Sequence, residues 1–128
     1  MGNGGRVLIC EDDCAIRGLL DKLLSRHGLV ADSVATGGEA IDRIRRNTYD
    51  LIVLDLLTPE VSGYDVLDLF RRERPELIDR IIVVTACQLA FNGALPVRVA
   101  AILRKPFDLA DFDAVVENVL NRQVARTT

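Results

Sequence analysis

Side chains suited to binding an ion stand directly after short apolar runs at four places in the chain. Three carboxylic acids follow the first run, one follows the second, a hydroxyl ends the third and an amine ends the fourth: Glu11, Asp12, Asp13, Asp55, Thr85 and Lys105. Carboxylates brought close together repel one another, and at least one carboxyl pKa rises unless a cation joins them. Mg²⁺ suits such a set because it prefers oxygen ligands and keeps several waters.

A cation site with a lysine and a hydroxyl nearby would suit a phosphoryl group. The metal would take one phosphoryl oxygen, Lys105 a second and the Thr85 hydroxyl a third. Asp55 follows four apolar residues, so it would stand at the end of a rigid buried strand, as a nucleophile should. Attack by an aspartate on phosphorus gives an acyl phosphate, a recognised covalent intermediate. The residue types therefore indicate phosphoryl chemistry at Asp55, provided that the fold gathers them.

The apolar runs predict strands. Runs that are apolar on consecutive positions are typical of strands buried on both faces, as in a parallel sheet covered by helices. Three runs are of this kind, and two shorter or weaker ones are read as further strands. The five predicted strands are 6–10, 29–34, 49–55, 80–85 and 100–104.

Helical spacing of apolar residues separates these strands. Four helices are predicted to begin after side chains suited to N-capping, namely Asp13, Thr36, Ser62 and Asp108. The stretch 87–99 is the hardest to assign, because Asn-Gly and Pro interrupt any helical pattern there. Alternation of strand and helix indicates a parallel sheet with right-handed crossovers and helices on both faces. In such sheets ligands bind beyond the carboxyl ends of the strands, where the polar residues above are expected to meet.

Composition narrows the class of protein. A chain of 128 residues with 49% hydrophobic and 27% charged residues is expected to form one globular domain. The net charge of −3 argues against general DNA binding, which needs a basic surface. No apolar run is long enough to span a bilayer, and the N-terminus lacks a secretory apolar segment. The three cysteines form neither a disulfide framework nor a metal motif, so a soluble, reduced, cytoplasmic protein is predicted.

Four segments, taken together and in order, resemble the receiver domain of bacterial response regulators. Each is weak alone, but all four end a predicted strand; they are 7–13, 51–59 with Gly63 after it, 83–86 and 105–107. The resemblance implies an α/β, flavodoxin-like (βα)5 fold, doubly wound, with strand order 2-1-3-4-5. It also implies a single receiver domain over 6–124, with a flexible N-terminus at 1–5 and a tail at 125–128.

The resemblance also assigns a phosphoacceptor and a metal site. Asp55 would receive a phosphoryl group from a sensor histidine kinase or a histidine phosphotransfer protein. Asp12 and Asp55 would bind Mg²⁺ directly, Glu11 through water, and Leu57 through its carbonyl oxygen. The domain would be no enzyme toward other molecules, since it would catalyse only its own phosphorylation and dephosphorylation.

Switching and partners follow from the same resemblance. Lys105 would pair with the phosphoryl oxygens, the Ala86 amide would donate to one of them, and Thr85 would swing inward on phosphorylation. The signal would pass to a downstream protein target or output domain of a two-component system, without direct contact with nucleic acid or membrane. A homodimer would use the fourth helix, the fifth strand and the fifth helix.

The chain departs from the receiver pattern at three places. Ile102 stands where receivers usually carry an aromatic residue, which puts coupling to the last helix in question. The stretch between Thr85 and Lys105 is short and lacks the usual Gly-Ala. Leu57 and Cys87 are apolar at positions that flank the path of attacking water, so slow hydrolysis of the phosphoryl group is predicted.

Two other functions remain open from the sequence. A pseudo-receiver that binds partners without taking phosphate is compatible with Ile102 and the unusual stretch before it. An aspartate-nucleophile phosphatase would need a second aspartate at position 57, where the chain has leucine. Glu11, Asp12 and Asp13 alone would also fit an acidic cluster at a helix N-terminus.

Overall fold

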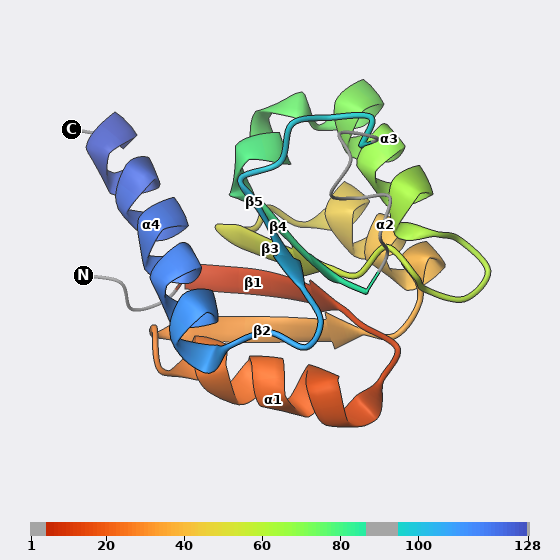
Figure 1. Cartoon of the computed structure of the whole chain (residues 1–128). Helices are drawn as coiled ribbons and strands as arrows, with labels where there is room; N and C mark the ends of the chain where they lie inside the picture. The colour runs from red at the N-terminus through yellow and green to blue at the C-terminus, as the bar shows by residue number, and fades with distance from the viewer. Residues whose placement is uncertain (1–4, 87–94, 128) are drawn as a thin grey trace.

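The computed structural model describes residues 5–86 and 95–127. Its centre is one parallel sheet of order β2-β1-β3-β4-β5 (Figure 1). The strands are β1 (Gly5–Cys10), β2 (Leu29–Val34), β3 (Leu51–Leu54), β4 (Ile81–Thr85) and β5 (Ala101–Arg104). The predicted strand order 2-1-3-4-5 is confirmed.

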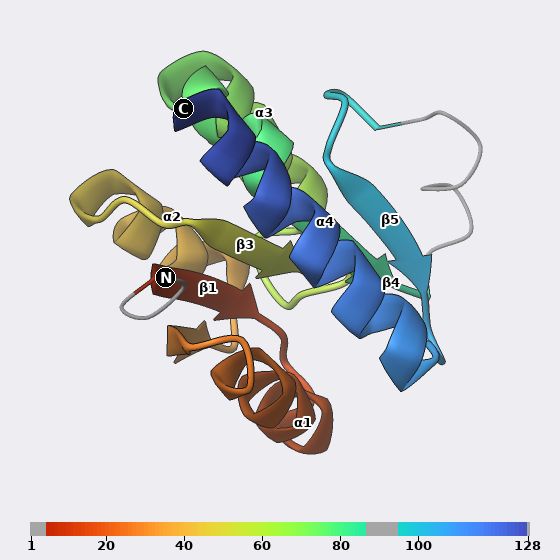
Figure 2. The same ribbon diagram turned by 90° about the vertical axis from the view of Figure 1, so that its left-hand side faces the viewer.

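Helices cover both faces of the sheet. They are α1 (Cys14–Ser25), α2 (Gly37–Arg46), α3 (Gly63–Glu73), the 3₁₀ helix η1 (Pro75–Arg80) and α4 (Leu109–Thr127). Leu20, Leu24, Phe112 and Val116 of α1 and α4 share one buried cluster with alternate residues of the strands. Helices α2 and α3 pack with the other set of strand residues. Figure 2 shows α4 lying across the sheet, on the side opposite α3.

Burial explains why these segments form a parallel sheet. All of β3 and β4 and the last four residues of β1 are buried, as their uninterrupted apolar sequences predict. The outer strands β2 and β5 contain partly or fully exposed positions, which matches their weaker patterns. The central strands therefore provide a rigid base for whatever residues follow them.

The predicted helix starts are confirmed by their side-chain caps. At each start a side-chain oxygen accepts a hydrogen bond from an unpaired backbone amide of the first turn. The pairs are Asp13 Oδ1 with Ile16 N, Thr36 Oγ1 with Glu39 N, Ser62 Oγ with Asp65 N, and Asp108 Oδ1 with Ala110 N.

Some boundaries differ from the sequence reading. The first strand begins at Gly5, inside the expected flexible N-terminus, because that residue pairs with Leu29 of β2. The short helix η1 was not predicted, and α4 continues through Thr127. Much of the difficult stretch 87–99, including residues 87–94, lies outside the described residues.

Two glycines hold the loop between β3 and α3 against the rest of the fold. A Cβ on Gly63 would lie 2.5 Å from Leu56 Cα and 2.6 Å from the Asp55 carbonyl oxygen. A Cβ on Gly37 would lie 2.1 Å from the Val61 carbonyl oxygen. The loop after Asp55 is therefore packed against the first residue of α2 as well as against α3.

Substitution of Gly37 by Ala is expected to destabilise the protein. The added methyl group meets a backbone oxygen rather than a flexible side chain, so α2 or the loop must shift, at a cost of about 1–3 kcal/mol. Gly38→Ala is the matched control in the same helical turn, because a Cβ there would come no closer than 4.0 Å to the Thr36 hydroxyl. The control is expected to be neutral or slightly stabilising. Urea unfolding measures both; equal stability of the two variants would contradict this packing.

None of the helices in 5–86 and 95–127 is long and apolar enough to cross a membrane.

Candidate functional site

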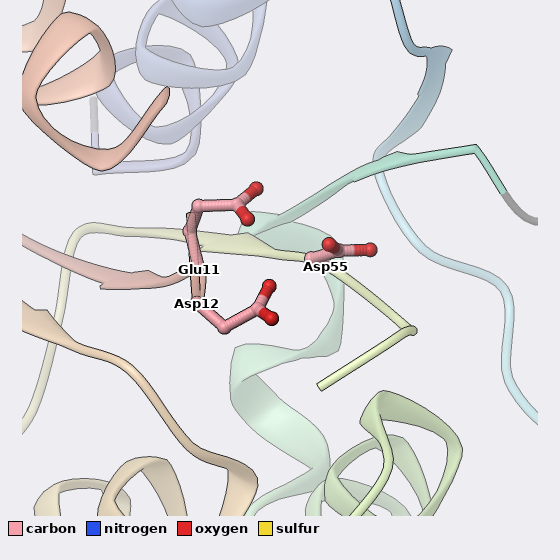
Figure 3. A group of neighbouring side chains, drawn as sticks. All are labelled: Glu11, Asp12 and Asp55. Atoms are coloured by element: carbon pink, nitrogen blue, oxygen red, sulfur yellow. The ribbon is translucent and has the colours of Figure 1, made fainter. Parts of the chain in front are cut away.

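Three carboxylates meet where β1 and β3 end. Because Cys10 pairs with Leu54 in the sheet, and the Asp55 amide donates to the Cys10 carbonyl oxygen at 3.0 Å, the residues after the two strands come together. One carboxylate oxygen from each of Glu11, Asp12 and Asp55 lies within 4.8 Å of the others. Figure 3 shows the Glu11 and Asp12 side chains extending toward the side on which Asp55 lies. The predicted cluster is thus present.

Lys105, which follows β5, completes the site at the same edge of the sheet. Its Nζ donates to Glu11 Oε1 at 2.5 Å and to Asp55 Oδ2 at 2.9 Å. Its backbone amide donates to the Thr85 carbonyl oxygen at 3.0 Å, which fixes the end of β5 against the end of β4. The ammonium group therefore bridges the two buried carboxylates.

Backbone amides bind the remaining carboxylate oxygens of Glu11 and Asp55. The Asp13 amide donates to Glu11 Oε2 at 3.0 Å, and the Leu57 amide donates to Asp55 Oδ1 at 3.1 Å. Glu11 is 1% exposed and Asp55 5% exposed, whereas Asp12 is exposed to solvent. The two buried carboxylates are therefore held in fixed orientations, as a nucleophile and a metal ligand require.

Burial and charge shift the ionisation of the pair formed by Glu11 and Lys105. Burial raises the pKa of Glu11 above its usual value, although hydrogen bonds from Lys105 and from the Asp13 amide oppose the rise. Burial by itself lowers the pKa of Lys105, but hydrogen bonds to Glu11 and Asp55 outweigh it and leave that pKa raised. Lys105 is therefore a cation at neutral pH.

The chemistry of these donors fits a hard divalent cation. All three side chains offer carboxylate oxygens, and the exposed Asp12 leaves room for water ligands. Mg²⁺ is usually bound by one or two carboxylates together with several waters. The residues present therefore fit Mg²⁺ better than a soft metal, which would favour thiolates or imidazoles.

A comparison with protein families decides what kind of domain carries this site. Residues 7–117 match the family model of the response regulator receiver domain. The chain belongs to this family. It is a receiver domain of response regulators, as the four sequence segments indicated.

Curated relatives of this receiver domain are longer proteins. The transcriptional regulatory protein TcrA of Mycobacterium tuberculosis is 31% identical over 119 residues, covering 88% of this chain and 44% of TcrA. The DNA-binding transcriptional regulator NtrC of Azospirillum brasilense is 33% identical over 122 residues, covering 90% of this chain and 24% of NtrC. The receiver domain thus spans less than half the length of these two relatives.

Solved structures show the same fold, and two of them contain magnesium. The response regulator TrrA from Thermotoga maritima, solved in complex with Mg²⁺-BeF, has a TM-score of 0.80 and 27% identity over 91% of this chain and 99% of that one. The receiver domain of a Pseudomonas aeruginosa sensor histidine kinase, solved with magnesium in its active-site cleft, has a TM-score of 0.81 and 25% identity over 92% and 98%.

The other predicted site residues lie at the same edge of the receiver domain. Thr85 ends β4 and is fully buried, while Ala86 after it is exposed. Leu57 is 54% exposed. Ile102 of β5 is partly buried against the core. Cys87, predicted to flank the water path, lies outside the described residues.

Two contacts of the site were not anticipated from the sequence. One is the pairing of Lys105 with Glu11, since the sequence analysis assigned the lysine to the phosphoryl oxygens and named no protein partner for it. The other is Arg17, whose guanidinium donates to the carbonyl oxygens of Glu11 and Asp12. The sequence does place Arg17 one helical turn after the N-cap Asp13. Helical side chains point toward the helix N-terminus, so a long side chain at this position can reach residues 11–13.

Proposed function

We propose that this receiver domain accepts a phosphoryl group on Asp55 in a Mg²⁺-dependent reaction. The donor is a sensor histidine kinase or a histidine phosphotransfer protein. The observation that carries this proposal is the buried Asp55 carboxylate, which lies beside two further carboxylates and within 2.9 Å of the Lys105 ammonium. Few structural roles call for this combination, because three close carboxylates carry more negative charge than the single Lys105 ammonium offsets.

The transfer itself is a nucleophilic substitution at phosphorus. A carboxylate oxygen of Asp55 forms the new bond to phosphorus while the bond between phosphorus and the donor's imidazole nitrogen breaks. The Leu57 amide and Lys105 hold the carboxylate in place before the reaction. The positive charge of Lys105 offsets the negative charge of the arriving phosphoryl oxygens.

Mg²⁺, when bound, neutralises further charge on the phosphoryl oxygens. We assign Asp12 and Asp55 as its direct ligands, Glu11 as a ligand through water, and the Leu57 carbonyl oxygen as the fourth protein group. The oxygen-only donor set, with one oxygen of each carboxylate within 4.8 Å of the others, supports this assignment.

Phosphorylation would change contacts with other proteins. The Ala86 amide would donate to a phosphoryl oxygen and Thr85 would contribute its hydroxyl, altering the surface near β4 and β5. The receiver unit would span 6–124 and work in the cytoplasm on a downstream target or an attached output domain. Self-association would use β5 and α4, together with the expected fourth helix, whose residues fall largely in 87–94, outside the described residues. The domain would catalyse only its own phosphorylation and dephosphorylation.

Beryllofluoride distinguishes this function from that of a pseudo-receiver. It mimics a phosphoryl group on a carboxylate. Adding it to the Mg²⁺-bound wild type is expected to shift the Thr85 and Ala86 amide resonances beyond the change caused by Mg²⁺ alone, and adding it without Mg²⁺ should leave them unchanged. Asp42→Asn, on the exposed surface of α2, is the control and should behave as the wild type. A wild type that fails to respond would instead identify a binding module that is never phosphorylated.

Leu57→Asn is expected to shorten the lifetime of the phosphorylated state. Leu57 is 54% exposed beside Asp55, where an apolar side chain hinders an attacking water and gives it no hydrogen bond. An amide at this position would hydrogen-bond that water and orient it toward phosphorus, so faster hydrolysis is expected. Loss of radiolabelled phosphate measures the effect. Faster loss from the wild type than from Leu57→Asn would contradict it.

A further inference from the structure

Arg17 connects α1 to the turn that carries the acidic pair. Its Nη1 donates to the carbonyl oxygen of Glu11 at 2.8 Å and lies 3.4 Å from that of Asp12. Residues 11–13 belong to neither β1 nor α1. The directions of the Glu11 and Asp12 side chains therefore depend on how this turn is held.

The position of Arg17 on a fixed helix makes such a contact stable. Its amide donates to the Asp13 carbonyl oxygen at 2.9 Å, so the residue lies in the first hydrogen-bonded turn of α1. Three and seven residues further on, Leu20 and Leu24 are buried in the core. The guanidinium thus extends from a rigid support to a segment without regular structure.

The two carboxylates do not depend on this support equally. Glu11 is also held by Lys105 and by the Asp13 amide. Asp12 is exposed, and its backbone carbonyl is one of the two that Arg17 contacts. The orientation of Asp12 should therefore be the more sensitive to loss of Arg17.

We infer that Arg17 is a positioning residue of the metal site, holding the β1–α1 turn so that Glu11 and Asp12 face Asp55. This inference rests on the proposed function, because it takes Mg²⁺ to be the ion bound there. Arg17 acts through backbone carbonyls and itself binds no metal. Groups that orient metal ligands from outside typically change metal affinity 10–100-fold.

The direction in which Mg²⁺ affinity changes when Arg17 is removed distinguishes a positioning role from a purely electrostatic one. A guanidinium near a cation site repels Mg²⁺, so removing it would tighten binding if charge alone mattered. If Arg17 positions the turn, removing it weakens binding instead. The two roles therefore differ in the sign of one measurement.

The experiment is an NMR titration of Arg17→Met with Mg²⁺, read from the amide resonances of Asp13 and Leu57. Affinity about tenfold weaker than in the wild type is expected, together with shifted Asp12 and Asp13 amides in the metal-free variant. Arg26→Met, at the other end of α1, removes the same charge and should leave both readouts unchanged.

Unchanged or tighter Mg²⁺ binding by Arg17→Met would overturn the positioning role, whereas a wild type that binds no Mg²⁺ would overturn the proposed function itself. Should the Met variant fail to fold, Arg17→Lys provides the same test. It keeps the charge but loses the planar fork of donors, so several-fold weaker binding is expected and unchanged binding would refute positioning.

Discussion

Asp55→Asn should abolish incorporation of phosphate from a histidine kinase or from acetyl phosphate. The amide that replaces the carboxylate has no anionic oxygen with which to attack phosphorus. Its NH₂ group would also face the Lys105 ammonium, which now lies 2.9 Å from a carboxylate oxygen, unless the amide places its oxygen there. Mass spectrometry of the intact protein measures the added phosphoryl group directly.

The control for this loss is Asp42→Asn, on the exposed surface of α2, where the carboxylate pairs with Arg46 in the same helix. It should take up phosphate at the wild-type rate. Because Asp55→Asn removes one of three neighbouring carboxylates, the variant is expected to remain folded, and thermal unfolding checks this. Equal phosphate uptake by Asp55→Asn and the wild type would show that another residue is the acceptor.

Lys105→Met is expected to have the largest effect on stability. The substitution leaves Glu11 and Asp55 buried without their shared cation, Lys105, whose side chain is itself only 16% exposed. Removing one partner of a buried ion pair typically costs about 3–5 kcal/mol. Urea unfolding at neutral pH without Mg²⁺ measures the loss.

The pH dependence of this loss has a definite sign. Burial already raises the folded-state pKa of Glu11 above its ordinary value of 4.5, and loss of the Lys105 hydrogen bond should raise it further. A carboxyl group with a raised pKa favours folding below its unfolded pKa and loses that contribution as pH rises through the folded pKa. The stability deficit of Lys105→Met should therefore shrink as pH falls toward 4.5 and widen toward neutrality.

Lys22→Met provides the matched control, because Lys22 lies exposed in the last turn of α1. Its unfolding free energy should stay within about 0.5 kcal/mol of the wild type. A Lys105→Met variant as stable as this control at neutral pH would mean that the ion pair at the site contributes nothing to the fold.

Much of the fold could be predicted because buried strands and helix faces require apolar residues at regular positions, and the sequence shows that spacing. The runs that became β1, β3 and β4 are apolar at every buried position except Thr85, and Asp13 and Thr36 cap helices as their types suggest. The 3₁₀ helix η1 was not predicted because its six residues, Pro75–Arg80, are too few to show a periodic apolar pattern.

The site was predictable as far as topology determines it. Residues that follow neighbouring parallel strands must share one edge, so Glu11, Asp12, Asp55 and Lys105 could be brought together without coordinates. The hydrogen-bond partners of Lys105 could not be predicted. In the fold its ammonium lies between the carboxylates of Glu11 and Asp55 and donates to both. The reach of Arg17 likewise depends on a turn conformation that composition does not specify.

The central claim is that Asp55 is the phosphoacceptor, and identifying the phosphorylated residue tests it most directly. Borohydride reduces an aspartyl phosphate to homoserine, so the protein is treated with acetyl phosphate and Mg²⁺, reduced and sequenced by mass spectrometry. Homoserine at position 55, formed only when Mg²⁺ is present, is the expected result. Homoserine at another position, or an intact Asp55 in protein that has taken up phosphate, would contradict it.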